Sequence, residues 1–234
     1  MAHLEIATVS FLTEERALKP LLPPGIELAG EPVVTVEVAR ISELEWLAGR
    51  GYNTVGVRFP ARFRGKTREV TGPFLAILWE NKADPIITGR EELGFAKLYC
   101  EIPPERVLNG QRCHEASWEG HRFMDMTVGD LVSAEAQASP TDGTLHYRYV
   151  PTVGTPGKCE GQGVVITPPS PMVELLGHAR GRGNVRFHES TWEQLPTLFH
   201  IVNALAELPI VAWKGASVTE LRCDTSLHNH MVVE

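Results

Sequence analysis

Lys97 is the residue of this sequence whose type and setting most directly suggest chemistry. It lies in the run Gly89-Arg-Glu-Glu-Leu-Gly-Phe-Ala-Lys97-Leu-Tyr99, where the residues around the lysine are apolar and strand-like. A buried ammonium group is costly unless it is paired or neutral. Burial also disfavours the charged form of an amine, and a desolvated lysine can attack a carbonyl carbon. We therefore expect Lys97 to be a buried nucleophile.

The same run resembles the signature of the acetoacetate decarboxylase superfamily, Gly-Arg-Glu-x-x-(Gly/Ala)-(Phe/Tyr)-Pro-Lys. The family lysine at the position of Lys97 forms a Schiff base with the substrate. Residues 17–24, 52–65 and 185–189, with the run 195–209 that follows, also agree in order and spacing, so the resemblance covers nearly the whole chain. It implies a cone-like, closed, mainly antiparallel β-barrel with an apolar interior, and assembly into homo-oligomers.

Three positions depart from the family pattern. A second lysine follows the Schiff-base lysine in the decarboxylases, and here that position is Leu98. The active-site glutamate of the family aligns with Thr54, and an arginine near the first strand aligns with Leu4, beside His3. We therefore expect a cavity that lacks the family carboxylate. These departures argue against acetoacetate itself as the substrate.

Further candidate site residues follow from strand alternation around Lys97 and along 52–65. Phe95 and Tyr99 would share a face with Lys97, and Thr54 would share a face with Arg58. Arg58 could bind a substrate carboxylate, or lie on the outer surface or at an oligomer interface. The candidate catalytic residues are Lys97, Tyr99 and Thr54; the candidate substrate-binding residues are Arg58, Arg90, Tyr52, Phe95 and Glu92.

Several of the polar candidate residues could have a structural role instead of a functional one. Arg90 belongs to the signature and could simply brace the loop. Glu91 or Glu92 could act as an acid or a base, and His188-Glu189 matches a His-Glu pair of the family, but such pairs are more often structural. Tyr99 could donate a proton or be a core tyrosine.

These residues predict an enzyme that forms a Schiff base with a small oxo acid through Lys97. An iminium draws electrons from the neighbouring bond, so decarboxylation, aldol or dehydration chemistry could follow. One alternative is a biosynthetic cyclase or dehydratase in which Lys97 acts only as a charge. Another is a ligand-binding protein that kept the family cavity and lost turnover.

Composition excludes several other classes of function. The net charge is −7 and no basic stripe could follow a phosphate backbone, so we expect no nucleic-acid partner. No apolar run approaches the ~20 residues that span a bilayer, and no signal sequence begins the chain, so we expect no membrane partner and a cytoplasmic protein. The chemistry requires no cofactor.

The cysteines and histidines do not form a convincing metal site. Four dispersed cysteines suit free thiols in a reducing compartment. His228 and His230 could join Cys223 at a zinc ion, but the spacing of four ligands is incomplete and a solvated C-terminal tail is the preferred reading. We expect no metal.

Hydrophobic patterning predicts a domain that is mostly sheet. Alternation in Val33 to Ile41 predicts a strand over 32–41. Similar patterns predict strands over 4–12, 52–63, 72–79, 85–88, 93–102, 119–126, 131–138 and 145–150, with a hairpin turn at 140–143. Helical spacing predicts a short helix over 14–22, helical turns in 42–48 and a long helix over 191–208. We expect one α+β domain over 1–234, a mainly antiparallel, cone-like closed β-barrel with a few helices.

Overall fold

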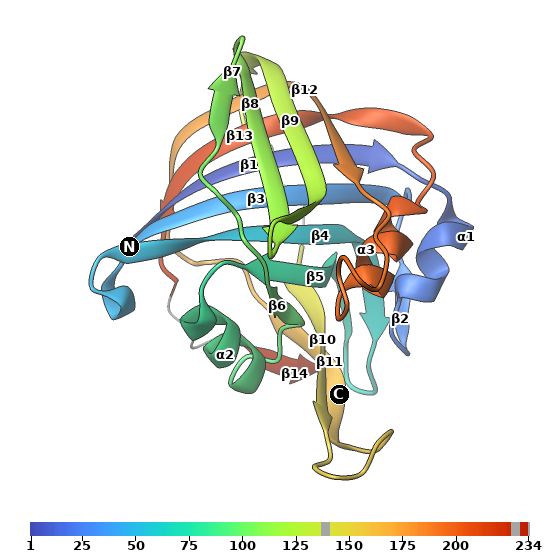
Figure 1. The fold of residues 1–234 in the computed structure, drawn as a ribbon. Helices are drawn as coiled ribbons and strands as arrows, with labels where there is room; N and C mark the ends of the chain where they lie inside the picture. Colours follow the sequence, from blue (N-terminus) through green and yellow to red (C-terminus); the bar gives the residue numbers. More distant parts are fainter. Residues whose placement is uncertain (137–140, 226–229, 234) are drawn as a thin grey trace.

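The structure is a computed structural model that describes residues 1–136, 141–225 and 230–233. One hydrogen-bonded sheet runs in the order β14-β11-β10-β5-β4-β3-β1-β13-β12-β9-β8-β7, while β2 pairs with β4 and β6 with β5 (Figure 1). The strands are β1 (Ala2–Leu12), β2 (Ile26–Leu28), β3 (Val33–Leu44), β4 (Arg50–Arg64), β5 (Glu69–Glu80), β6 (Lys97–Tyr99), β7 (Arg106–Leu108), β8 (Gln111–Trp118), β9 (His121–Ser133), β10 (Thr144–Pro151), β11 (Cys159–Thr167), β12 (Val173–Phe187), β13 (Ala212–Cys223) and β14 (Met231–Val233).

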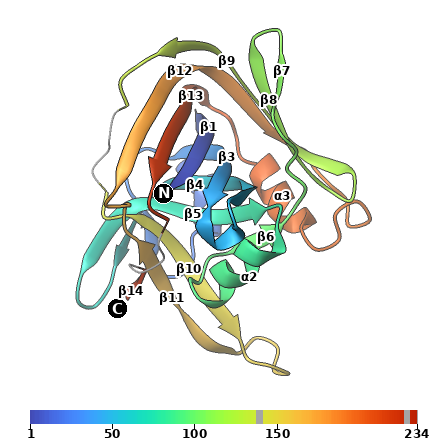
Figure 2. The ribbon, with the colours of Figure 1, turned by 90° about the vertical axis from the view of Figure 1, so that its left-hand side faces the viewer.

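Short helices lie at the rim of this sheet. They are α1 (Glu15–Leu18), α2 (Ala83–Glu91) and α3 (Phe199–Ala206), with the 3-10 turns η1 (Lys19–Leu21) and η2 (Glu45–Leu47). Figure 2 shows the strong curl of the sheet, with β10 and β11 lying across from β12 and β13. A space is left between these walls for side chains.

The sheet is mixed and its ends do not meet. β6 and β10 both pair with β5 in the parallel sense, whereas the other pairings of named strands are antiparallel. Within the described residues, β14 and β7 stand at opposite ends of the strand order and do not pair with each other. The antiparallel-rich character is confirmed, but hydrogen bonds do not close the sheet into the expected barrel.

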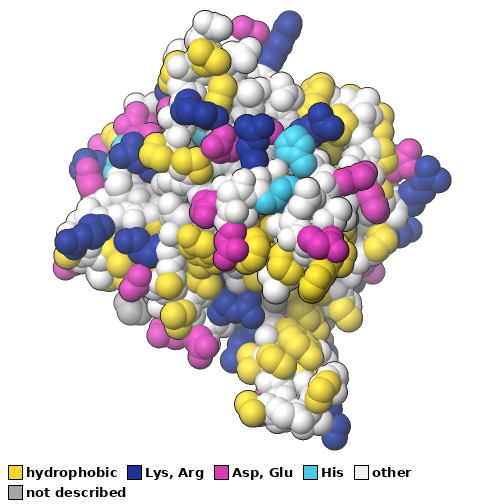
Figure 3. All heavy atoms as spheres, viewed as in Figure 1, with side chains coloured by type: hydrophobic (Ala, Val, Ile, Leu, Met, Phe, Trp, Pro, Cys, Tyr) yellow, Lys and Arg dark blue, Asp and Glu magenta, His cyan; other side chains and the backbone are white. Residues whose placement is uncertain are grey.

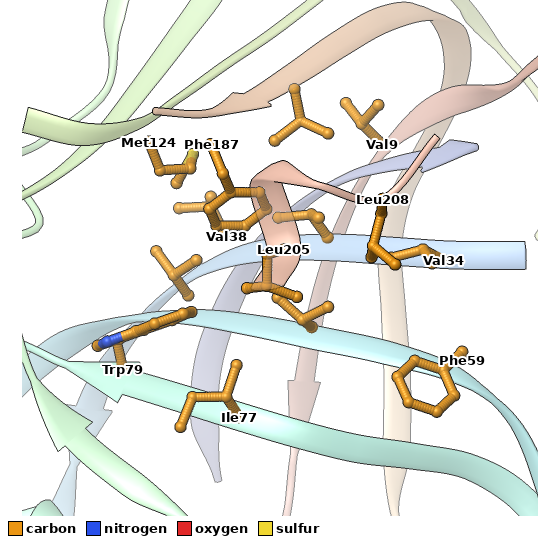
Figure 4. Packing of buried hydrophobic residues seen from close by; sticks show 14 of the residues in the cluster. Val9, Val34, Val38, Phe59, Ile77, Trp79, Met124, Phe187, Leu205 and Leu208 are labelled. Atoms are coloured by element: carbon orange, nitrogen blue, oxygen red, sulfur yellow. The ribbon is translucent and has the colours of Figure 1, made fainter. Parts of the chain in front are cut away.

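One face of the sheet holds a continuous apolar core. Alternate residues of the central strands, such as Val36, Val57 and Trp79, are almost completely buried on this face. Figure 4 shows Leu205 of α3 and Leu208, which follows it, packed over this face with Phe187. The sheet and α3 therefore bury their apolar sides against each other.

Several local predictions were wrong in detail. The separate strands expected over 119–126 and 131–138 are one strand, β9, which ends at Ser133. The segment 85–88 is part of α2 rather than extended, because a proline is tolerated in the first helical turn, where its missing N–H has no partner to lose. The segment 93–102 contains only the short β6. The long helix over 191–208 shrinks to α3, preceded by turns around Pro196.

The hairpin predicted at 140–143 is also wrong. β9 pairs with β8 and β12, whereas β10 pairs with β11 and β5, so the two strands are not neighbours. Pro140 lies outside the described residues. Asp142 instead binds Thr71: its carboxylate accepts from the Thr71 N–H, and its own N–H donates to the Thr71 carbonyl. The residue types in a segment can predict that a turn forms, but they do not predict which strands the turn joins.

On the face shown in Figure 3, basic and acidic side chains are interspersed, and no large patch carries charge of one sign. Within the part of the chain that the structure describes, no helix is long and apolar enough to cross a bilayer. All four cysteines are free thiols.

Candidate active site

Lys97 begins β6, which follows α2 and adds to the edge of β5. Residues Leu78 and Lys97 are register partners in the parallel pair of β5 and β6. Arg90, in the last turn of α2, donates from Nη1 to the Lys97 carbonyl at 2.9 Å. The β5-α2-β6 unit therefore fixes the backbone of the lysine, and Arg90 has the bracing role rather than a contact with the Lys97 amine.

The Lys97 side chain runs inward past Gly89. A Cβ atom built on Gly89 would lie 2.4 Å from both Cε and Nζ of Lys97, closer than real contacts allow. Gly89 is the first residue of the signature, and the structure gives a steric reason for it. The glycine leaves the channel through which the lysine reaches the interior.

The Lys97 ammonium group is buried and has specific partners. Its Nζ lies 2.9 Å from Oε1 of Glu80 and donates to the Pro85 carbonyl at 3.0 Å. It also lies over the ring of Phe95, 5.3 Å from the centroid. The lysine is 6% exposed and Glu80 is 1% exposed, so this ion pair is shielded from solvent.

Glu80 corrects the expectation that the cavity lacks a carboxylate. Thr54 on β4 and Glu80 on β5 are register partners in an antiparallel pair, so their side chains share a face. The acidic group has its place one strand away from the position expected from the family pattern. Sequence reasoning missed it, although a glutamate that ends an apolar strand is an available signal.

Burial sets the protonation behaviour of the acidic groups beside Lys97. It raises the pKa of Glu80, an effect that the nearby Lys97 only partly offsets. Burial, together with the Glu80 charge, also raises the pKa of Tyr52, so that this residue remains a neutral phenol. Oε2 of Glu80 has no hydrogen-bond partner among the described residues. The site thus holds a basic carboxylate with a vacant acceptor atom and a phenolic donor.

Lys97 lies between two cavities that share part of their lining. The inner cavity, of about 340 Å³, is lined by the side of β1, β3, β4 and β5 opposite the apolar core, by Phe95 and by residues 167–171. The outer cavity, of about 790 Å³, is lined by residues 1–2, by the η2 turn and by the start of α2. Both cavities reach Lys97 and Tyr52.

Arg58 and Thr54 both line the inner cavity, and Thr54 is 5% exposed. Arg58 is not on the outer surface. Its Nη2 donates to Oε1 of Glu37 at 2.9 Å, and its Nε is buried with no hydrogen-bond partner among the described residues. Arg58 therefore places a guanidinium group at the wall of the inner cavity, where it is paired with Glu37.

Phe95 stacks on a buried histidine that the sequence did not single out. Its ring is 3.9 Å from that of His146, which is 0% exposed and donates from Nε2 to the Leu93 carbonyl at 2.9 Å. Burial lowers the pKa of His146 to about 4, so the imidazole is neutral near pH 7. This stack holds Phe95 against the Lys97 amine.

His230, which the sequence placed in a solvated tail, takes part in the site. His230 lines the inner cavity and packs edge-on against Phe95, with ring centroids 5.7 Å apart. His228 lies outside the described residues. Among those described, no group of three or more His, Cys, Asp or Glu residues could hold a metal ion.

The other predicted residues lie away from Lys97. Tyr99 is 49% exposed and lines neither cavity, although it belongs to the same three-residue strand as Lys97. Glu91 and Glu92 are exposed at the end of α2. Leu98 packs against the apolar core, so a lysine there would not reach the Lys97 amine.

His188 and Glu189 belong to a different region. They line a separate cavity beside α3, and His188 Nε2 lies 2.6 Å from Oδ2 of Asp125. Leu4 lines the inner cavity, while the neighbouring His3 binds Glu220 and Ser42 instead. The pair at 188–189 therefore has a structural setting at the base of α3.

Comparisons with known proteins show which family this chain resembles. The family model described as Acetoacetate decarboxylase (ADC) matches residues 1–224. No curated protein gives a significant match. An acetoacetate decarboxylase structure has 16% identity and a TM-score of 0.73, covering 99% of this chain and 86% of that chain.

Two further solved structures show the same fold. Acetoacetate decarboxylase from Legionella pneumophila has 19% identity and a TM-score of 0.70, with 94% of this chain and 82% of that chain covered. The enduracididine biosynthesis enzyme MppR, complexed with the condensation product of pyruvate and imidazole 4-carboxaldehyde, has 16% identity and a TM-score of 0.71, with coverages of 99% and 88%. With the family match over residues 1–224, these likenesses lead to one conclusion: the chain belongs to the acetoacetate decarboxylase family.

Proposed function

We propose that this protein is a lyase that forms a Schiff base between Lys97 and the carbonyl carbon of a small oxo acid. The observation that carries the proposal is the buried Lys97 amine, 2.9 Å from a Glu80 oxygen and at the junction of two cavities. Membership of the acetoacetate decarboxylase family supports it. The argument from the site itself is that a nucleophile, a base and space for a ligand meet at one point.

Glu80 prepares the amine for attack. Because burial raises the pKa of Glu80, its carboxylate can accept a proton from the Lys97 ammonium across their hydrogen bond. The neutral amine adds to the carbonyl carbon, and a nitrogen proton moves to the oxygen to give a carbinolamine. Glu80 then returns its proton to the hydroxyl, which leaves as water while the C=N bond forms. Glu80 is a carboxylate before and after the step.

The resulting iminium carries the positive charge that the ammonium carried, so the pairing with Glu80 persists through the reaction. The iminium draws electrons from a neighbouring C–C bond, which breaks in the lyase step. Tyr52 lines both cavities and stays a phenol, so it can donate a proton to the carbon left behind. The Arg58 guanidinium, at the wall of the inner cavity, is the cation that holds the substrate carboxylate.

Pyruvate-like acids are candidate substrates beside acetoacetate. MppR, which shares the fold, has been seen with pyruvate and with a condensation product of pyruvate. Leu98, Thr54 and Leu4 differ from the decarboxylase pattern in this chain. Aldol-type cleavage of a pyruvate-derived acid therefore belongs to the proposal together with decarboxylation.

The test is borohydride trapping of the imine. Wild-type protein incubated with acetoacetate or pyruvate should give a reduced adduct on Lys97, identified by peptide mass spectrometry. Lys97→Met removes the nucleophile at similar volume and should give no adduct and no turnover. Circular dichroism and thermal unfolding check that the variant is folded.

Two outcomes would favour the alternatives. Ligand binding that survives Lys97→Met, with no turnover in wild type, would indicate a binding protein that kept the cavity. Turnover that survives in Lys97→Arg, which keeps the charge and loses the nucleophile, would indicate a cyclase or dehydratase that uses position 97 as a charge. Failure of every oxo acid to modify Lys97 would overturn the Schiff-base mechanism.

A further inference from the structure

The outer cavity is larger than a three- or four-carbon acid requires. Its volume is about 790 Å³, against about 340 Å³ for the inner cavity. Cavities of roughly 300–1,000 Å³ hold ligands of drug size. The residues that line both cavities are Ile41, Tyr52, Leu93, Lys97, Asp224 and Thr225. A molecule joined to Lys97 can thus extend into the outer cavity.

Several of the side chains that line the outer cavity are apolar. Met1, Ala2, Ile41, Leu44 and Pro85 contribute aliphatic surface. Trp46, on the η2 turn, is 53% exposed, and its ring meets that of Tyr52 edge-on with centroids 6.5 Å apart. An exposed tryptophan adds nothing to the buried core, but it provides a flat apolar surface for a ligand at the wall of this cavity.

Charge distinguishes the two ends of the joined cavities. Among the described residues lining the outer cavity, Glu43, Glu45 and Asp224 are acidic and Lys97 is the one basic side chain. Arg222 lies 3.2 Å from Glu43 and offsets its charge, but Glu45 remains beside this end of the cavity and disfavours a second carboxylate there. In the inner cavity the Arg58 guanidinium is paired with Glu37, and it is the cation that a substrate carboxylate can approach. A substrate carboxylate therefore fits the inner cavity better than the outer one.

We propose that the outer cavity binds an apolar, uncharged tail of the oxo acid, so that the preferred substrates are long-chain alkyl or aryl oxo monocarboxylic acids. This inference rests on the proposed Schiff-base function and adds the substrate class. Lys97 engages the carbonyl, Arg58 holds the carboxylate, and the tail lies along Trp46 and Tyr52. Burial of a methylene group strengthens binding by about threefold to fourfold, so affinity increases with chain length until the cavity is full.

The experiment is imine trapping with a series of straight-chain 2-oxo acids, from pyruvate through 2-oxobutanoate and 2-oxohexanoate to 2-oxooctanoate. The half-saturating concentration for trapping on Lys97 should fall by about threefold per added methylene. The dicarboxylic acid 2-oxoglutarate should trap at least tenfold less well than 2-oxopentanoate, which has the same chain length. Phenylpyruvate tests an aromatic tail.

Trp46→Ala should reduce the gain per methylene and weaken trapping of 2-oxooctanoate by about tenfold. Trp192→Ala is the matched control, because Trp192 is also exposed, at 62%, and lines neither cavity. It should leave the whole series unchanged. A flat series in wild type, or equal trapping of 2-oxoglutarate, overturns the tail site while leaving the Schiff base intact. Absence of trapping with every acid, acetoacetate included, overturns both.

Discussion

The two faces of β1, β3, β4 and β5 carry side chains of opposite character. One face buries Val36, Val57 and Trp79 in the apolar core, and the other presents Thr54 and Glu80 to the inner cavity. Neighbouring residues on one strand thus serve different purposes, since side chains alternate between faces. We expect substitutions on the core face to lower the free energy of unfolding, and substitutions on the cavity face to lower activity at nearly constant stability.

The largest expected effect is on the core side. Phe123 of β9 is 0% exposed and its ring centroid lies 5.4 Å from that of Trp79. Phe123→Ala should lower the free energy of unfolding by about 3–5 kcal/mol, because it leaves a cavity in a packed core. Urea unfolding measures the loss. Imine trapping per folded molecule should stay within about twofold of wild type; a larger fall would break the division between the faces.

Glu80→Gln tests the cavity side. It should lower kcat/KM on the order of a hundredfold to ten-thousandfold, the range for loss of an acid–base group. The free energy of unfolding should fall by less than in Phe123→Ala, because the buried Lys97 loses its anionic partner but can also lose its own proton. Glu69→Gln, on the exposed ion pair with Arg64, is the control and should change neither quantity.

The pH dependence of kcat/KM gives a second test of the role of Glu80. The carboxylate form is required as the base, so kcat/KM should rise with pH as Glu80 loses its proton. Because burial raises the pKa of Glu80, this limb should lie above the pH expected for an ordinary glutamate. Glu80→Gln should remove the limb. A limb that persists in the variant would assign the titration to another group.

The buried His146 should make the free energy of unfolding depend on pH. Its pKa is about 4 in the folded protein and about 6.5 in the unfolded chain. Between these values the unfolded chain binds a proton that the folded protein does not, so stability falls as pH falls from about 6.5 to about 4, by about 3 kcal/mol in all. His146→Gln, which can still donate to the Leu93 carbonyl, should remove this part of the pH dependence. Equal slopes in urea unfolding would contradict the assignment.

Gly89→Ala should separate activity from stability in one substitution. The new methyl group would displace the flexible end of Lys97, and a displaced reacting group can cost about a hundredfold in kcat/KM. The higher helix propensity of alanine, worth up to about 1 kcal/mol, should offset part of the stability lost when the buried Lys97 moves away from Glu80. Gly177→Ala is the control, since nothing lies within 4 Å of its added Cβ. Unchanged trapping in Gly89→Ala would show that Lys97 has another route to the cavity.

The sequence predicted the fold best where side chains alternate. The strands around Val36 and Val57 follow from a period of two, and the resemblance around Lys97 led to the correct family. Prediction from the sequence failed where a strand pairs with a segment that lies far away along the chain. No local signal shows that β10 joins β5 or that β14 and β7 remain apart.

Some residues of the candidate site could likewise be predicted from the sequence, and others were missed. Lys97 could be found from one charged residue in an apolar run, and Phe95 from its place in the same signature. Glu80 offered only the weak signal of a glutamate that ends an apolar strand, and His146 offered none, because strand register and burial bring them to Lys97. Tyr99 was misplaced because alternation gives the face of a strand but not how far the cavity extends along it: Tyr99 lies in β6 with Lys97 and is exposed.

The β5-α2-β6 unit has a consequence for how the protein folds. Elsewhere the sheet is assembled from distant segments, as where Ala2 meets Cys223 in the pair of β1 and β13. The nucleophile and its base, by contrast, lie on consecutive elements of one short stretch of chain, with a low local contact order. Contacts close in sequence form early because little loop-closure entropy opposes them. The reactive pair should therefore assemble before the sheet that later encloses it, and should move as one piece when the chain is permuted or recombined.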